Sequence, residues 1–380
     1  MYVVTQAMPK TKQISFEDWL LNDIPEEWFE APSFRTTNTI TRITNHVSET
    51  VCQRERFTRF RAALDEWMLK YEHLYAVANR HELYHEFKIP KKTHGYRQIC
   101  APNTELMEAL RELKEIMEEL MPVNYHTSAF AYIKGRSTVD CVKRHRDAKS
   151  NWFLKTDFSN FFGSTTMEFL KAQLETIFPF SEVFGDPETS VIMERALDLC
   201  FLDGGLPQGT PISPMLTNLM MIPFDHRVCN AIAKQGFTYT RYADDIQISR
   251  IKSFMFKDMV SYLNETCAEF GAPFQIKSEK THYGSKAGAN WMLGLMLNKD
   301  DEITVGRREK ENLRQQAYHF STDFKAGNPW PIEDTQYLAG RISYLRQVEP
   351  KYCAGWEGYI SRTYGLDFMG AIKAVIKGVA

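Results

Sequence analysis

Two adjacent carboxylates are the first residues in the chain that could do chemistry together. Asp244 and Asp245 lie between segments 237–242 and 246–250, whose alternating apolar and polar residues predict two β-strands. A tight turn between these strands would hold both carboxylates at a fixed separation. Carboxylate oxygens bind hard divalent cations, and a pair of such ions supports in-line phosphoryl transfer. An Asp-Asp pair also occurs as ordinary turn chemistry, so its interpretation depends on the rest of the sequence.

A third carboxylate stands upstream, at the end of another predicted strand. Residues 151–157 have the pattern of a buried strand that ends at Asp157, and an aromatic segment and a helix start follow. Thr165 and Glu168 have the spacing of a capping box, which predicts where that helix begins. Taken alone, Asp157 would be an exposed acid at a strand end.

A glycine-containing loop lies between these acids. Gln208 and Gly209 belong to a proline-rich segment, 206–214, which leads into a predicted helix over 215–224. A glycine at a helix start lets the backbone approach a ligand and directs free N–H groups at it. Without the acids on either side, the segment would be an ordinary loop.

In this order the three segments resemble motifs A, B and C of reverse transcriptases. The Tyr-Ala-Asp-Asp form resembles that of retroviral, group II intron and bacterial retron enzymes. Segments 97–102 and 131–137 resemble finger motifs of the intron and retron enzymes, with Ala131 in place of the usual first glycine. Segments 276–281 and 291–295 resemble motifs D and E, with Lys277 where the family more often has asparagine.

This resemblance implies an α+β, right-hand polymerase fold with fingers, a palm of antiparallel sheet and helices, and a helical thumb. The expected parts are an N-terminal extension with a basic helix (1–75), fingers (76–150), a palm with motifs A to E (151–300), and a helical thumb with a C-terminal tail (301–380). Apolar spacing predicts a helix over 52–77, and strands are expected at 83–89 and 96–100. Asn103 or Thr104 should cap the next helix, and Trp19, Trp28 and Phe29 suggest some packing in the lead-in.

The resemblance also implies roles for the acids. Asp157, Asp244 and Asp245 would be the catalytic carboxylates around two Mg²⁺ ions, for which Mn²⁺ could substitute, and Phe158 would offer its backbone carbonyl. Asp157 and Asp244 would bridge both metals, with Asp245 in a supporting position. One ion would lower the pKa of the primer 3′-OH, and the other would neutralise the triphosphate and the leaving pyrophosphate.

Nucleotide contacts follow from the same motifs. Phe162 falls where the family keeps an aromatic gate against a 2′-OH, although Phe161 and Phe162 could instead be core residues. The family motifs also place Gln208 and Gly209 against the incoming nucleotide. Arg97, with Lys91 or Lys92, is expected to hold the triphosphate, because Arg binds phosphate as a fork and Lys as a point charge. Lys280 would be a general acid for pyrophosphate or a further triphosphate contact.

Basic residues outside these motifs are the expected nucleic-acid contacts. The net charge is −2, so any grip on phosphates must be local. Such charge runs are otherwise solvated surface. The candidates are Arg136, Lys143, Arg144, Arg146, Arg307 and Arg308.

Composition excludes several other classes of protein. The 380 residues are 43% apolar and 25% charged, as in an ordinary globular protein. We find no apolar run long enough for a membrane span and no signal-peptide core, so a cytoplasmic protein without membrane contact is expected. Seven scattered cysteines without a CxxC pair argue against a zinc site or a disulfide framework.

The functional expectation is an RNA-directed DNA polymerase that makes cDNA from an RNA template in bacterial antiphage defence. Its partners would be the template, which could be a cognate non-coding RNA, dNTPs, the DNA product, and an effector protein or a second copy of the chain. About 15 residues follow the expected thumb, too few for an RNase H, maturase or endonuclease domain. Segment 141–145 keeps only the His of the retron Asn-Ala-x-x-His element, and 292–294 keeps only the Gly of Val-Thr-Gly, which favours a retron-like enzyme outside the typical retrons.

Three alternatives remain open. The chain could be a retron enzyme that makes msDNA from its cognate non-coding RNA. It could be a template-independent or protein-primed DNA polymerase on the same palm, because priming depends on what occupies the cleft. It could also be a nucleic-acid-binding scaffold that neutralises a toxin, although a scaffold has no physical need for three intact carboxylates.

Overall fold

The structure is a computed structural model, and it describes residues 38–90, 95–276, 278–288 and 291–378. Trp19, Trp28 and Phe29, with the packing predicted for them, lie outside the described residues, as do Lys91 and Lys92. Within the described residues the fold is α+β with antiparallel sheets, as the sequence predicted.

The N-terminal part combines two helices with a hairpin. Helix α2 (Asn38–Tyr71) begins earlier than predicted and is followed by the short helices η2 (Glu72–Ala76) and η3 (Arg80–Leu83). Trp67 is fully buried between α2 and α3 (Thr104–Leu120), and its indole N–H donates to the carbonyl of Ala109 at 2.8 Å. Asn103 caps α3 as expected, since its side chain accepts from the N–H of Leu106 at 2.9 Å. Strands β1 (Tyr84–Pro90) and β2 (Tyr96–Pro102) form the predicted antiparallel pair.

A four-stranded antiparallel sheet lies at the centre. Its order is β4 (Phe237–Tyr242), β5 (Asp245–Arg250), β3 (Trp152–Asp157) and β6 (His282–Ser285). The predicted strands at 151–157, 237–242 and 246–250 are all confirmed to within one residue.

Helices pack on both faces of this sheet. They are α4 (Thr138–Asp147), α5 (Phe161–Ser164), α6 (Met167–Leu174), α7 (Phe180–Gly185), α8 (Pro187–Asp198), α9 (Ser213–Met220), α10 (Ile222–Ala233), α11 (Phe256–Glu269) and η4 (Ser278–Lys280).

Two local predictions in this part are wrong. The helix expected over 215–224 is split into α9 and α10, because Pro223 occupies the first turn of a new helix. The predicted capping box is shifted by one residue: Thr166 caps α6 by accepting from the N–H of Phe169, whereas the hydroxyl of Thr165 donates to the carbonyl of Phe161 at 2.8 Å.

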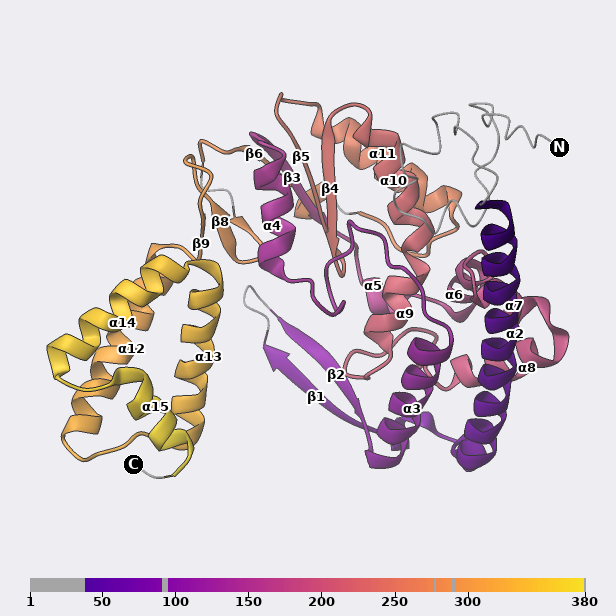
Figure 1. Cartoon of the computed structure of the whole chain (residues 1–380), viewed down its shortest axis with the longest axis horizontal. Helices are drawn as coiled ribbons and strands as arrows, with labels where there is room; N and C mark the ends of the chain where they lie inside the picture. The colour runs from indigo at the N-terminus through magenta and orange to yellow at the C-terminus, as the bar shows by residue number, and fades with distance from the viewer. Residues whose placement is uncertain (1–37, 91–94, 277, 289–290, 379–380) are drawn as a thin grey trace.

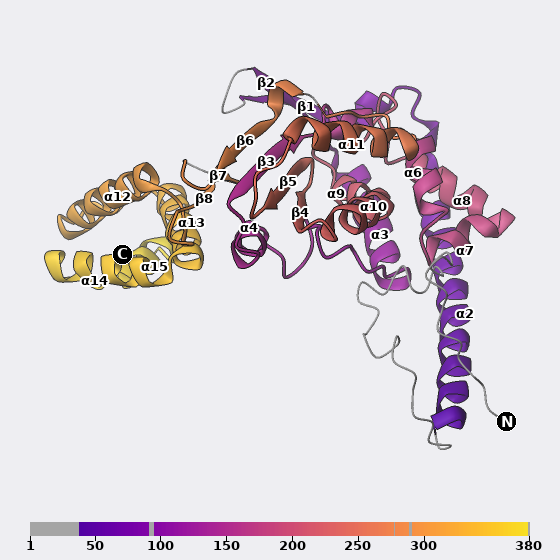
Figure 2. The same ribbon diagram turned by 90° about the horizontal axis from the view of Figure 1, so that it is seen from above.

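A small sheet leads from the centre to a separate group of helices. Strands β7 (Trp291–Met292), β8 (Leu295–Leu297) and β9 (Ile303–Thr304) precede α12 (Arg307–Lys325), α13 (Ile332–Val348), α14 (Pro350–Tyr364) and α15 (Phe368–Ile376). These four helices, here called the helical lobe, lie to one side of the central sheet, on the opposite side from α2 (Figures 1 and 2). The expected C-terminal tail is largely the helix α15, whose Phe368 is fully buried.

Two hydrophobic cores meet at the central sheet. Leu154 and Ile248 pack into the larger core, together with α3, α6, α9 and α10. Phe153 packs instead with Val139 and Val142 of α4 into the core of the helical lobe. Because successive side chains of a strand point to opposite faces, β3 contributes one face to each core.

Candidate active site

The three predicted carboxylates meet at one edge of the central sheet. Asp157 ends β3 and lies directly opposite Asp245, the first residue of β5. Asp244 occupies the two-residue turn between β4 and β5 with Ala243, whose φ of +55° is in the left-handed region. The N–H of Phe158 donates to the carbonyl of Asp244 at 3.2 Å, so the backbone itself joins the two acidic segments.

The acids disfavour one another's negative charge. Burial raises the pKa of Asp245 to about 6, and the charges of Asp244 and Asp157 add to the effect. The pKa of Asp244 is also raised, first by burial and then by Asp157. Lys280 opposes both shifts and donates to Oδ2 of Asp157 at 2.6 Å. A bound cation would relieve this repulsion, which is what an oxygen-rich metal site requires.

The carboxylate oxygens present are donors of the kind that a divalent ion binds, although they do not form a complete coordination shell. Oδ1 of Asp157 is buried and has no hydrogen-bond partner, so one hard oxygen is available at the centre of the site. Among the residues that the structure describes, no three His, Cys, Asp or Glu side chains are gathered closely enough to hold an ion jointly. Ion binding would therefore draw these carboxylates together.

The glycine loop packs against strand β2. The carbonyl of Gln208 accepts from the N–H of Cys100 at 2.8 Å. Gly209 has φ +123°, and a Cβ there would lie 2.9 Å from the carbonyl oxygen of Cys100. Arg97, exposed on the same strand, favours the charged form of Asp244. The structure therefore places Gln208 and Gly209 against the strand that carries Arg97.

The two phenylalanines after Asp157 have different surroundings. Phe161 is 2% exposed and stacks on Phe158 at 5.4 Å between ring centroids. Phe162 is half-buried and meets Phe161 edge-on at 5.7 Å. Its carbonyl accepts from the N–H of Leu206, so the glycine loop fixes its backbone. Phe161 is thus the core residue of the pair, and Phe162 is the one with a free face.

A fully buried ion pair beneath the turn was not identified from the sequence. Arg241 and Asp225 are both 0% exposed, and Nη2 of Arg241 donates to Oδ2 of Asp225 at 2.7 Å. Nη1 donates to the carbonyl of Ala243 at 3.1 Å and to Oδ1 of Asn218 at 3.3 Å. The pair therefore holds the turn that carries Asp244. The available signal was an arginine inside the predicted strand 237–242, because an arginine that becomes buried there needs a partner.

The predicted nucleic-acid contacts fall into two groups. Nη1 of Arg136 donates to the carbonyls of His126 and Ala129, both at 2.6 Å, and Arg144 donates to the carbonyl of Thr127 at 2.6 Å. This geometry favours a structural role for these two arginines, because main-chain carbonyls occupy donors that a phosphate would need. Three other candidates pair with exposed acids, which a phosphate could replace: Lys143 with Asp140, Arg146 with Asp147, and Arg307 with Glu311. Arg308 is an exposed residue of the first turn of α12.

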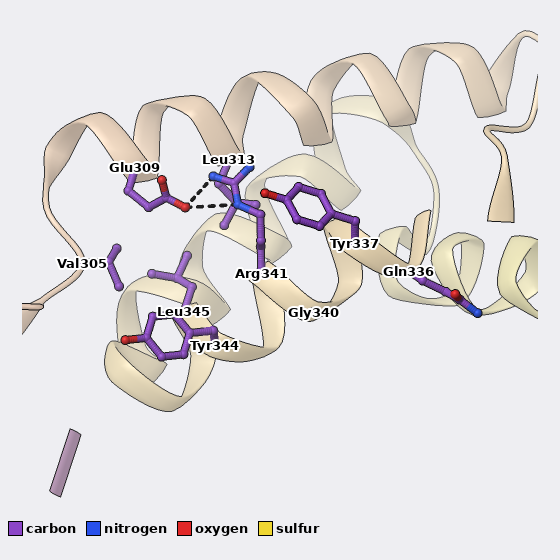
Figure 3. A pocket seen from close by; sticks show the side chains of 9 residues that line it. All are labelled: Val305, Glu309, Leu313, Gln336, Tyr337, Gly340, Arg341, Tyr344 and Leu345. Carbon is purple, nitrogen blue, oxygen red and sulfur yellow. Dashed lines mark hydrogen bonds and ion pairs between the residues drawn. The ribbon is translucent and has the colours of Figure 1, made fainter. Parts of the chain in front are cut away.

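A groove of about 310 Å³ runs between α12 and α13 of the helical lobe (Figure 3). Tyr337 and Tyr344 lie on either side of Gly340, and Arg341 pairs with Glu309 across the groove. The pKa of Tyr242, at the end of β4, is raised by burial and in smaller part by Cys141 and by Tyr344 of this groove.

Comparison with known proteins agrees with this geometry. Residues 89–316, more than half of the chain, match the family model of reverse transcriptase (RNA-dependent DNA polymerase). The chain therefore belongs to the reverse transcriptase family and is an RNA-directed DNA polymerase by class. Reverse transcriptases act on RNA templates and depend on divalent metal ions.

Among curated relatives, the chain is similar to retron reverse transcriptases. It is 27% identical to the retron Ec83 reverse transcriptase of Escherichia coli over 309 residues, which cover 78% of this chain and 91% of that protein. It is 28% identical to the retron Ec73 reverse transcriptase of Escherichia coli over 275 residues, which cover 70% and 84%. Both relatives thus match over most of their length.

Solved structures give a weaker similarity. An apo telomerase from Candida tropicalis aligns with a TM-score of 0.46 and 11% identity, covering 78% of this chain and 62% of that one. The chain thus spans about three fifths of the telomerase. No helix within the described residues is long and apolar enough to cross a membrane.

Proposed function

We propose that the chain copies RNA into DNA at Asp157, Asp244 and Asp245, with two Mg²⁺ ions as the metals. The observation that supports this most directly is the register of β3 and β5, which sets Asp157 opposite Asp245 with a buried, unpartnered carboxylate oxygen. When bound, the ions would activate the primer 3′-OH and neutralise the charge of the triphosphate. Phe158, whose N–H bonds to Asp244, would hold the strand end and offer its carbonyl.

The protein groups around the acids would position the nucleotide. Lys280, already bonded to Asp157, would move to the triphosphate or donate a proton to pyrophosphate. Arg97, with Lys91 or Lys92, would hold the phosphates. The glycine loop would support the sugar and base, and Phe162 would exclude a 2′-OH. In this scheme residues 76–150 act as fingers, 151–300 as the palm, and 301–380 as the thumb and tail, behind an extension over 1–75.

We further propose a retron-like role in antiphage defence. Similarity to retron reverse transcriptases supports the retron-like part of this proposal. In it the template would be a structured non-coding RNA, and the partner would be an effector protein or a second copy. His145, which the sequence shares with a retron element, is fully buried and bonds to Ser249 and Thr240 at 2.6 and 2.8 Å. This residue therefore supports the fold, and its presence does not by itself imply recognition of the same RNA.

Replacement of single carboxylates tests the metal assignment. Asp244→Ala or Asp157→Ala should lower Mg²⁺-dependent dNTP incorporation on a primed RNA template by several orders of magnitude, since each removes several kcal/mol of transition-state stabilisation. Circular dichroism should show that both variants are folded. Asp258→Ala, which removes an exposed acid from the first turn of α11, is the matched control and should remain active. Substantial synthesis by a folded Asp157→Ala, Asp244→Ala double variant would overturn the assignment.

A further inference from the structure

Tyr132 adopts a backbone conformation that its side chain disfavours. Its φ is +59°, in the left-handed region, where a Cβ crowds the main chain. Most of the residues with positive φ that the structure describes are glycine, asparagine or aspartate, whereas Tyr132 has a large aromatic side chain. The residue is 59% exposed, so burial of the ring does not explain the conformation. Strain of this kind is retained where the surroundings enforce it, often at functional sites.

Buried polar groups hold the chain on the N-terminal side of Tyr132. The side-chain amide of Asn218 donates to the carbonyl of Ala131 at 2.7 Å. The main chain of Arg241 accepts from the N–H of Phe130 at 2.9 Å and donates to the carbonyl of Ser128 at 2.7 Å. Since these partners belong to α9 and β4, the elements that carry the active site also fix the strained backbone.

The same bonds place Tyr132 beside the catalytic turn. Segment 128–130 runs along the outer edge of β4, with Ala129 paired to Arg241. Tyr132 follows this segment, at the end of the sheet where β4 enters the turn. The pKa of its hydroxyl is raised first by partial burial and then by Asp244 and Tyr242, whereas Arg97 lowers it. The charges of Asp244 and Arg97 thus both act on this ring, which agrees with its place at the turn.

We propose that the ring of Tyr132 is the surface on which the template base opposite the incoming nucleotide rests. Two of the groups assigned to the sugar and phosphates, Phe162 and Lys280, follow β3 and precede β6, on the other side of the turn, whereas Arg97 belongs to β2. The space next to β4 is therefore the one that the template strand would occupy. RNA-binding sites commonly stack single bases on exposed aromatic rings. This inference rests on the proposed function, because it uses the position of the catalytic acids.

Replacement by glycine separates strain from function. Tyr132→Gly removes both the ring and the left-handed strain, so the melting temperature should stay the same or rise. We expect kcat/KM for a templated dNTP to fall at least tenfold and misincorporation to increase. Tyr132→Phe keeps the ring and should stay within threefold of the wild type. Lys149→Gly is the matched control, because Lys149 also has a left-handed φ, of +53°, and it should leave activity unchanged.

The outcomes distinguish this inference from the proposed function. If the wild type and Tyr132→Phe incorporate dNTPs and Tyr132→Gly is stable but impaired, the inference is supported. If Tyr132→Gly is as active and accurate as the wild type, the inference is overturned while the proposed function stands. A melting temperature that falls together with activity would assign Tyr132 a structural role and would also overturn it. No template-directed synthesis by the wild type would contradict the proposed function itself.

Discussion

At the scale of single residues, Phe162 gives the sharpest test of substrate choice. If its free face excludes a 2′-OH, Phe162→Ala should admit ribonucleotides much better relative to deoxynucleotides, since the steric clash costs the wrong sugar several kcal/mol. Because Phe162 is only half-buried, its truncation should cost less stability than the roughly 3–5 kcal/mol typical of a core phenylalanine. The ratio of rNTP to dNTP incorporation, measured beside the melting temperature, checks both expectations.

The neighbouring residue supplies the control. Phe161 is 2% exposed, so Phe161→Ala should lower stability by the full core amount and leave the sugar preference of the remaining activity unchanged. If the ratio of rNTP to dNTP incorporation changed in Phe161→Ala and stayed the same in Phe162→Ala, the gate would be Phe161, and our proposal for Phe162 would be wrong.

The residues that could be identified from the sequence are those that belong to short motifs resembling the family's. Asp157, Asp244 and Asp245 were predicted from three short segments, and the strand register brings them together. The sequence left open which of Phe161 and Phe162 is core, since adjacent residues share one local pattern and only tertiary packing separates them. Tyr132 was missed because a positive φ at a non-glycine residue leaves no mark in the sequence.

At the scale of secondary-structure elements, the buried Arg241–Asp225 pair joins β4 to α10 beneath the catalytic turn. Arg241→Leu should destabilise the protein by about 3–5 kcal/mol, because it leaves a buried carboxylate without its cation. Replacing Asp225 by leucine as well should recover much of that loss, since no unpaired charge then remains. Urea denaturation of the two single variants and the double variant measures the coupling.

A surface ion pair makes the matched control. Arg227 and Glu269 are more than half exposed and lie 3.0 Å apart. Breaking them should cost no more than about 1 kcal/mol. If the double variant of Arg241 and Asp225 were less stable than either single variant, an unpaired buried charge would not be the cause of the loss, and this prediction would be wrong.

Element boundaries show where sequence reasoning stops. Strands β3, β4 and β5 of the central sheet and the cap at Asn103 follow from local pattern and were predicted correctly, whereas β6 was not predicted. The break between α9 and α10 depends on Pro223, which the predicted helix over 215–224 includes although proline cannot continue an i to i−4 ladder. The order β4-β5-β3-β6 was not predicted, because pairing between distant strands is set by the whole core and leaves no local pattern.

At the scale of the whole molecule, a net charge of −2 requires nucleic-acid binding to be local. Replacing Lys91, Lys92 and Arg97 together by alanine should make the log–log dependence of affinity on salt shallower by about one unit for each phosphate that the protein no longer neutralises. Asp244→Ala should bind as well as the wild type, because the carboxylate makes no phosphate contact of its own. Fluorescence anisotropy with a labelled RNA–DNA duplex at several salt concentrations gives these slopes.

A variant with the same charge change controls for the global field. Lys234, Lys252 and Lys257 are exposed and lie at the end of the central sheet opposite the carboxylates, where β4 begins and β5 ends. Their triple alanine variant should keep the wild-type slope. Equal slopes for all three proteins would show that the fingers hairpin lies off the path of the nucleic acid.

The two faces of β3 have a thermodynamic consequence. Phe153 belongs to the core of the helical lobe and Leu154 to the larger core, and the strand that holds both ends at Asp157. If binding of a duplex shifts the helical lobe against the sheet, β3 is the element that would carry the shift to Asp157. Linkage then requires that a metal ion or nucleotide bound at Asp157 changes the affinity for the duplex by the same factor as the duplex changes theirs.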